Sequence, residues 1–266
     1  MSLGPYEHLE VVTEGPVVRL TLNRPDCLNA LNDRMISELL EFFGALFWRH
    51  DLRVVVLTGA GRGFCAGLDL KNNSGSLVTS PSEILFRQRR ISEIIIAMRR
   101  CPQVIVALVN GAASGGGFAM VLASDIRIAV PTARMNAAFI RLGLSACDIG
   151  VSYFLPRMVG SAVAAEYMLT GRFIDAAKAL SLGLLSQVVE PDGLQTAAQA
   201  LIDDLLYASP LGLRLTKDAL NFAIDAQGLE AVIQMEDRNQ TLAAVGEDFP
   251  EGIAAFREKR RPRYGK

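Results

Sequence analysis

The segment from Val104 to Gly117, VIVALVNGAASGGG, joins six apolar residues to a loop that contains three consecutive glycines. A short, continuous apolar run that ends at Asn-Gly is typical of a strand buried on both faces. The segment 52–58 (LRVVVLT) has the same character and runs into the glycine-rich stretch 59–63 (GAGRG). Two buried strands that end in glycine loops predict an α/β core whose functional site lies on loops at the strand ends.

Other elements follow from the spacing of apolar residues around these two strands. The spacing predicts further strands over 15–22 and 125–129, and helices over 32–50, 81–100 and 115–123. After about Gly160 the pattern is mainly helical, with one strand near 186–189 and helices expected over 161–170, 175–181, 194–208, 211–226 and 229–245. We therefore expect a core over residues 1–195 and a helical C-terminal subdomain over residues 196–266.

The composition argues against several classes of protein. The 266 residues include 27 Lys and Arg against 28 Asp and Glu, so there is no basic excess for nucleic acid or a membrane surface. No apolar run approaches the roughly 20 residues of a membrane span, and the N-terminal residues do not resemble a signal peptide. Two histidines and four widely spaced cysteines offer neither metal-ligand spacing nor a disulfide framework. We expect a cytoplasmic protein that binds no nucleic acid, membrane or metal.

Two glycine loops are candidates for binding a negatively charged oxygen. The first loop is GFCAGLDL (63–70), and the second is NGAASGGGF (110–118), whose glycines open a helix so that its first N–H groups face outward. Each N–H donor aimed at such an oxygen is worth roughly 10²–10³ in rate when charge develops there. A glycine run on its own is more often a tight turn, and the common phosphate-binding motifs are absent. The pair of loops is more informative than either loop alone.

Several motifs resemble the crotonase (enoyl-CoA hydratase/isomerase) family in their order and spacing. They are NRPDCLNAL (23–31), GAGRGFCAGLDLK (59–71), NGAASGGG (110–117), SDI (124–126) and, at the C-terminus, EGIAAF (251–256) followed by KRRP (259–262). The resemblance covers nearly the whole chain. It implies a crotonase-like spiral of ββα units with a helical C-terminal region that forms trimers, often paired into hexamers. It also implies an acyl-CoA substrate and no separate cofactor.

The resemblance assigns roles by motif position. The N–H groups of Leu68 and Gly116 would form the oxyanion hole. The acyl-CoA would be bound by Cys27, Leu28, Ala66, Asp69, Leu70, Gly115 and Phe139. Lys259 would reach the CoA phosphates of a neighbouring subunit, or it would be a solvated charge on the C-terminal tail.

Hydratases of this family carry two glutamates at positions where this chain has Ala119 and Phe139. Neither side chain transfers protons, so efficient hydration is not expected. Asp148, in the segment GLSACDIGVSYFLPR (143–157), resembles the catalytic aspartate of family members that isomerise double bonds. One carboxylate suffices for this reaction, because it can remove the proton next to the thioester and return it two carbons away. We therefore predict an enoyl-CoA isomerase with Asp148 as the proton shuttle.

Several alternatives remain open at this stage. Asp148 could instead be the N-cap of a helix over 149–157. Apolar neighbours at 139, 149, 153 and 154 would raise the pKa of Asp148, whereas a cap hydrogen bond would lower it. Glu83 or Glu93 could supply a second acid or face solvent, and Cys65 or Cys147 could be a nucleophile. The other candidate functions are an enoyl-CoA hydratase, a hydrolase (including one that opens the ring of a cyclic β-ketoacyl-CoA), and a non-catalytic acyl-CoA carrier.

Overall fold

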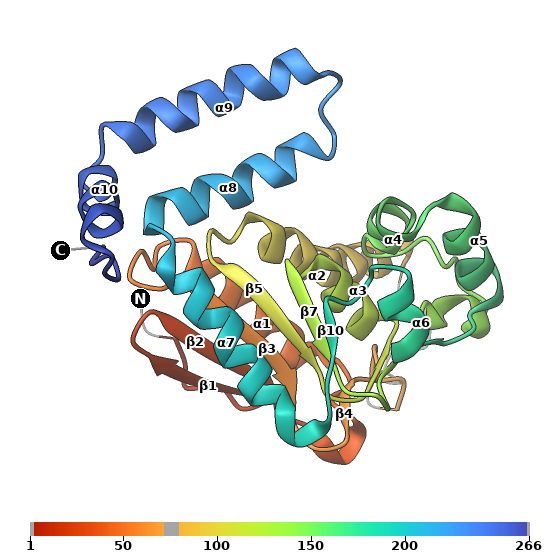
Figure 1. Cartoon of the computed structure of the whole chain (residues 1–266). Coiled ribbons are helices and arrows are strands. Elements are labelled where there is room, and N and C mark those ends of the chain that lie inside the picture. Colours follow the sequence, from red (N-terminus) through yellow and green to blue (C-terminus); the bar gives the residue numbers. More distant parts are fainter. Residues whose placement is uncertain (1–2, 72–79, 265–266) are drawn as a thin grey trace.

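The described strands form two sheets, and in each sheet the strands lie side by side in the order in which they occur along the chain. Figure 1 shows how the helices surround them. The computed structural model describes residues 3–71 and 80–264. The larger sheet has the order β1-β2-β3-β5-β7-β10, with bounds Leu9–Glu14, Val17–Leu22, Val54–Gly59, Val104–Val109, Ile126–Ala129 and Gln187–Val188. The smaller sheet has the order β4-β6-β8-β9, with bounds Gly63–Cys65, Ala112–Ser114, Arg134–Asn136 and Ile174–Asp175. Only the pairs β1–β2 and β8–β9 are antiparallel within these described strands.

The two sheets are built by a repeated unit. A strand of the larger sheet is followed by a strand of the smaller sheet and then by a helix. In the described residues this succession occurs as β3-β4-α2, β5-β6-α3 and β7-β8-α4, where α2, α3 and α4 span Pro81–Arg100, Gly116–Ala123 and Val151–Val159. The repetition confirms the predicted spiral of ββα units. It also places the loops that follow β4 and β6 next to each other.

Most of the predicted elements are present, with small shifts at their ends. The predictions for α2, β5 and α5 (Ser161–Thr170) match residue for residue. The helix expected over 32–50 is α1, Asp33–Leu46, which begins at the N-cap Asn32. It ends four residues early because the Gln103 side-chain amide donates to the carbonyl oxygens of Leu46 and Arg49, both at 2.9 Å, and so satisfies the helix end.

The C-terminal helices differ in how they contact the core. Helix α7 (Leu194–Tyr207) packs against β5 and β7, and its residues Ala198 and Ile202 are fully buried. Helices α8, α9 and α10 project beyond α7 (Figure 1), with bounds Pro210–Ala223, Leu229–Ala244 and Asp248–Glu258, and α8 also contacts β5. The predicted boundary near residue 195 stays a prediction, and in the structure the projecting part begins with α8. The sequence analysis missed α10, β1 and the four short strands of the smaller sheet, β4, β6, β8 and β9.

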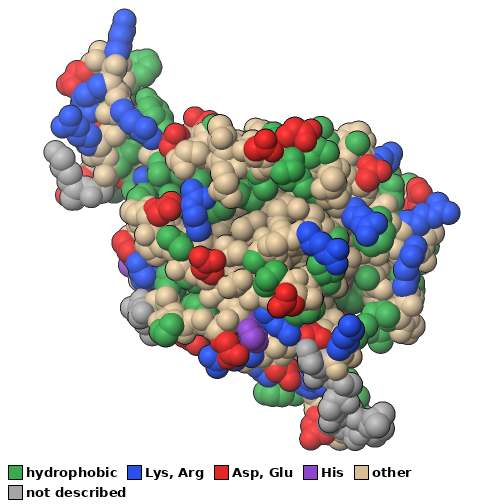
Figure 2. All heavy atoms as spheres, turned by 90° about the horizontal axis from the view of Figure 1, so that it is seen from below, with side chains coloured by type: hydrophobic (Ala, Val, Ile, Leu, Met, Phe, Trp, Pro, Cys, Tyr) green, Lys and Arg blue, Asp and Glu red, His purple; other side chains and the backbone are tan. Residues whose placement is uncertain are grey.

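The surface shows no single dominant charge on the face drawn in Figure 2, where basic and acidic side chains are interspersed. This distribution agrees with the near-equal numbers of the two kinds of residue. Among residues 3–71 and 80–264, no helix is both long and apolar enough to cross a bilayer.

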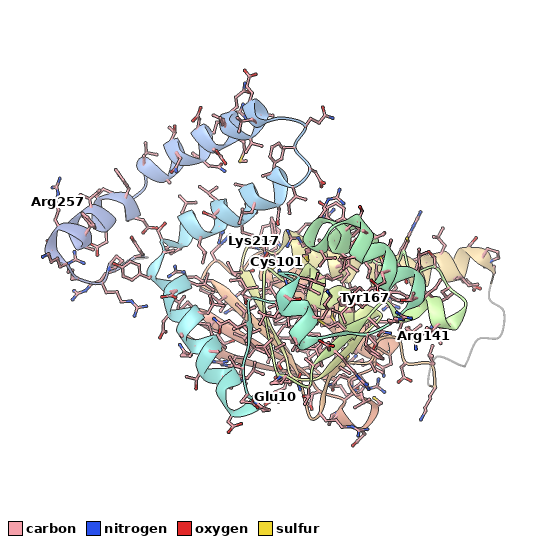
Figure 3. The ribbon with its side chains drawn as sticks, turned by 45° about the vertical axis from the view of Figure 1, so that its right-hand side comes forward. Glu10, Cys101, Arg141, Tyr167, Lys217 and Arg257 are labelled. Atoms are coloured by element: carbon pink, nitrogen blue, oxygen red, sulfur yellow. The ribbon has the colours of Figure 1, made fainter. Side chains whose placement is uncertain are left out.

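A buried ion pair joins α8 to the core. The Lys217 ammonium lies 2.8 Å from a carboxylate oxygen of Asp125 and donates to the carbonyl oxygen of Gln103 at 2.6 Å. Arg99 pairs with the other oxygen of Asp125 at 3.2 Å. Lys217 points from α8 toward the core near Cys101 (Figure 3). Because the side chain of Lys217 is only 4% exposed, its charge depends on these partners.

Replacing Lys217 by Met should lower the free energy of unfolding by about 3 kcal/mol, because it leaves buried acceptors without their donor. Urea unfolding followed by circular dichroism measures this change. The exposed Lys178→Met is the matched control and should leave the midpoint unchanged. Equal midpoints for the two variants would show that the ion pair does not stabilise the docking of α8.

Candidate active site

The two predicted glycine loops touch each other at the end of the smaller sheet. Strands β4 and β6 are parallel neighbours, so their carboxyl ends and the loops that follow lie side by side. A Cβ atom on Gly67 would lie 2.8 Å from the carbonyl oxygen of Ser114 and 3.4 Å from the nitrogen of Gly116. Gly67 also has a φ of +89°, a conformation that L side chains rarely adopt. Only glycine at this position permits the observed contact between the loops.

The two predicted oxyanion donors, the N–H groups of Leu68 and Gly116, lie at this contact. The Leu31 N–H donates to Gly67 O at 2.7 Å, and Leu31 O accepts from Asp69 N at 3.0 Å. In such a parallel bridge the intervening residue, Leu68, directs its own N–H to the opposite side. Gly116 is the first residue of α3, so its N–H has no acceptor within the helix. Within the described residues, neither N–H donates to a backbone carbonyl.

Asp148 lies in the loop before α4, and the prediction that it caps this helix is wrong. The N-cap is Gly150, whose φ of 87° turns the chain before the helix begins and which makes no side-chain cap. The Asp148 main-chain oxygen accepts from Val151 N at 2.9 Å. Its carboxylate oxygen Oδ1 accepts instead from Gln88 Nε2 at 2.5 Å and from Ile149 N at 2.8 Å.

Burial raises the pKa of Asp148 above its usual value, and this outweighs the lowering effect of the hydrogen bonds from Ile149 N and Gln88. The direction agrees with the prediction from its apolar neighbours, of which Ile149 and Phe154 are buried. Ile149 also links Asp148 to the glycine loops, because a Cβ on Gly116 would lie 3.8 Å from Ile149 Cδ1. Asp148 therefore directly precedes Ile149, the residue whose side chain reaches Gly116 at the start of α3.

Gln88, on α2, is the partner of Asp148 that the sequence analysis missed. The two acidic residues considered on this helix have other contacts. Glu83 accepts from Ser80 N at 2.8 Å in the capping box of α2, and Glu93 lies 3.4 Å from Arg100. The available signal was helical spacing, since Gln88 follows Ile84 by four residues on one face of the helix.

The residues predicted to bind coenzyme A come from two adjacent segments. The Ala66 N–H donates to Leu28 O at 2.9 Å, which places Cys27 and Leu28 beside the loop that contains Ala66 and Leu70. Cys27 and Leu28 are half-buried, whereas Ala66 and Leu70 are exposed. Their contact with CoA stays a prediction.

Three further predicted residues have different surroundings. The carboxylate of Asp69 is 4% exposed and pairs with Arg24 at 3.0 Å, so only its main chain is available to a ligand. The ring of Phe139 packs at 3.4 Å against the position of a Cβ on Gly115, which brings these two predicted residues together. Lys259 is the C-cap of α10. That helix carries Arg257, far from Arg141 and hence from the segment that contains Phe139 (Figure 3).

The candidate nucleophile Cys65 is unsuited to that role. It is fully buried, and burial raises the pKa of its thiol to about 12. Its Sγ lies 3.1 Å from the Asn29 carbonyl oxygen as a hydrogen-bond donor. The other candidate, Cys147, is exposed. Among the described residues, no three His, Cys, Asp or Glu side chains cluster as metal ligands would.

A groove with a volume of about 260 Å³ opens beside the glycine loops. It lies between α1, α2 and the loop after β4. The residues that line it are Asp33, Ile36, Leu68, Leu70, Ile84, Arg87, Gln88, Arg90 and Ile91. Because Leu68 and Gln88 are both among them, the groove joins a candidate oxyanion donor to the partner of Asp148.

Known proteins match this chain along nearly its whole length. The sequence model of the family described as Enoyl-CoA hydratase/isomerase matches residues 13–266. The probable enoyl-CoA hydratase EchA12 of Mycobacterium tuberculosis is 38% identical over 95% of this chain and 91% of that protein. The 1,2-epoxyphenylacetyl-CoA isomerase of Escherichia coli is 36% identical over 94% of this chain and 95% of that protein.

A solved structure supports the same relationship. The enoyl-CoA hydratase from Bacillus anthracis is 32% identical, covers 97% of this chain and 99% of its own, and superposes with a TM-score of 0.91. The repeated ββα units and the paired glycine loops are thus accompanied by similarity in both sequence and structure. The chain belongs to the enoyl-CoA hydratase/isomerase family and has the crotonase fold.

Proposed function

We propose that this protein is an enoyl-CoA isomerase that shifts a double bond between the β,γ and α,β positions, with Asp148 as the proton shuttle. The observation that carries the proposal is the single carboxylate of Asp148, partly buried and linked through Ile149 to the start of α3. The two positions where hydratases of the family carry glutamates hold Ala119, which is fully buried, and Phe139.

The proposed reaction uses the main chain to stabilise charge and one side chain to move a proton. The thioester oxygen accepts hydrogen bonds from the N–H groups of Leu68 and Gly116, which stabilise the dienolate. Both hydrogen bonds to the Asp148 carboxylate within the described residues end on Oδ1, which leaves Oδ2 to take the proton. Asp148 breaks the α C–H bond, the double bond moves, and the same proton forms the new γ C–H bond. No water, metal or cofactor is consumed.

Hydration is the second candidate, because a relative that is 38% identical is named as a probable enoyl-CoA hydratase. In this case Asp148 would have to activate water and a second group would have to protonate the α-carbon. The residues at 119 and 139 cannot do so. We therefore place isomerisation first.

We also propose that the chain forms homotrimers, single or paired into hexamers, in the cytoplasm. The projecting helices α8–α10 expose large apolar side chains, among them Leu229 at 75%, Val245 at 80% and Phe256 at 82%. Exposed apolar surface of this extent is typical of subunit interfaces. In such an assembly, Lys259 would be able to approach the CoA phosphates of a neighbouring subunit. The four free cysteines fit a reducing compartment.

Asp148→Asn should reduce turnover of a 3-enoyl-CoA by roughly 10²–10⁴-fold, because the variant lacks the base. The absorbance of the conjugated product measures the rate, and Cys147→Ser is the neighbouring control. Full activity of Asp148→Asn would refute the proposed role. A fall in absorbance with a 2-enoyl-CoA would identify a hydratase instead. No change in absorbance with either substrate would favour a hydrolase or a carrier.

Gln88→Met should move the acidic limb of the kcat/KM profile to higher pH. The Gln88 hydrogen bond favours the ionised carboxylate and lowers the pKa of Asp148, so its loss raises that pKa further. Since the base must be ionised, activity then appears only at higher pH. On the acidic limb, kcat/KM at a given pH should fall about tenfold or more, as expected for the loss of a hydrogen bond to a charged group. Glu93→Gln on the same helix is the control, and an unshifted profile for Gln88→Met would contradict the role of Gln88.

Gly67→Ala should lower kcat by roughly 10²-fold, because the new methyl group would push the Leu68 amide away from Gly116 and weaken one oxyanion donor. Gly44→Ala, at a helical position where a Cβ meets nothing within 4 Å, is the control. Steady-state kinetics with the same substrate measures both variants. A loss confined to KM would show that the contact between the loops affects binding alone.

A further inference from the structure

The groove beside the candidate active site contains two arginines at a mainly apolar surface. Ile84, Arg87, Gln88 and Ile91 follow the spacing i, i+3, i+4 and i+7, so α2 presents them on one face. Arg90, also on α2, lines the groove as well. The groove thus combines Gln88, which is bonded to Asp148, with apolar side chains and two guanidinium groups.

These guanidinium groups keep most of their hydrogen-bonding capacity. Arg90 Nη2 donates to the Ser37 hydroxyl at 2.6 Å. Arg87 Nη2 lies 4.0 Å from Asp33 Oδ1, which is the limit of an ion pair. Within the described residues, Arg90 forms no ion pair with a carboxylate. Each guanidinium has five N–H donors, so several remain for a ligand.

The charge of the groove lining favours an anion. Two arginines and one aspartate leave one net positive charge among the residues that line it. A planar carboxylate is the group that a guanidinium binds with two parallel hydrogen bonds.

We infer that the groove selects acyl-CoA substrates whose acyl chain carries a second carboxylate, and that Arg87 and Arg90 bind it. This inference rests on the proposed function, which places the thioester carbonyl at Leu68 and Gly116. With the thioester at Leu68, the apolar side chains of the groove would contact the hydrocarbon part of the acyl chain. The two arginines would bind the carboxylate at its end. An uncharged chain end would instead leave the two guanidinium groups partly desolvated and unpaired, which disfavours its binding.

The phosphates of coenzyme A are the other anions of the substrate. Of the eight residues predicted to bind the acyl-CoA, only Leu70 lines this groove. The lining beside Leu68 is formed largely by leucine and isoleucine side chains, which suit an acyl chain better than a diphosphate. The carboxylate is therefore assigned to the acyl group.

Equilibrium binding of non-reacting saturated ligands tests this inference separately from catalysis. Isothermal titration calorimetry compares adipoyl-CoA with hexanoyl-CoA, and succinyl-CoA with butyryl-CoA, on the full chain. In at least one pair, the ligand with the carboxylate should bind about tenfold tighter, as expected for a charged hydrogen-bonded pair. Arg87→Met and Arg90→Met should each reduce this ratio severalfold. Arg89→Met removes the same charge from an exposed position on the same helix outside the groove, and should leave the ratio unchanged.

Three outcomes would overturn the inference. They are equal affinities within both ligand pairs in the unmodified protein, an unchanged ratio in both arginine variants, and equal weakening of both ligands of a pair in those variants. The last result would assign the arginines to the CoA phosphates, and pantetheine thioesters, which lack those phosphates, would then bind the variants normally. Full turnover by Asp148→Asn would refute the proposed reaction but would leave the carboxylate preference intact, so the two failures are distinguishable.

Discussion

The contact between the loops after β4 and β6 is the constraint on which the rest of the site depends. Three glycines keep side chains out of this region, because a Cβ on Gly111 or Gly117 would lie 2.2 Å from a backbone oxygen of the β4 region, and one on Gly67 would lie 2.8 Å from Ser114 O. These approaches are too close for any side chain. They fix the start of α3 beside Leu68 and so bring together two N–H groups that have no backbone acceptor in residues 3–71 and 80–264. A catalytic arrangement made from the main chain cannot be adjusted by exchanging side chains, so it is specified by where glycine occurs.

The position of Asp148 depends on the same contact through an unusual backbone conformation. Ile149 has a φ of 35°, in a region that β-branched residues rarely adopt, and Gly150 follows with a φ of 87°. These two residues turn the chain so that the Ile149 side chain packs toward Gly116 and the Asp148 carboxylate faces α2. Strain of this kind persists only where the surroundings impose it, and it is concentrated at functional sites. The outlier thus supports a functional role for Asp148 independently of its motif.

The sequence predicted the elements whose signals are local and missed the contacts that join distant segments. Strand β5 and helix α2 were predicted because an apolar run and a helical period are readable within about 20 residues. The hydrogen bond from Gln88 to Asp148 joins residues 60 positions apart in the sequence, so no local pattern predicts it. The same limit explains Asp69, where a motif suggested a ligand contact but the folded chain supplies Arg24 as a buried partner. The alternative of a cap at Asp148 is not realised, because Gly150 occupies the N-cap position and the Asp148 carboxylate accepts from Gln88 and Ile149.

In the proposed isomerisation, Gln88 gives the single carboxylate of Asp148 a neutral hydrogen-bonding partner. A second carboxylate at hydrogen-bonding distance would raise the pKa of Asp148 by like-charge repulsion, and would require one of the pair to hold a proton. A neutral amide in that position instead donates to Oδ1 and favours the ionised form, while burial favours the neutral form. Burial is the larger of these opposed effects, so the pKa of Asp148 lies above its usual value. An amide cannot deliver a proton, so the arrangement suits a reaction in which the proton that is removed is also the proton that is returned.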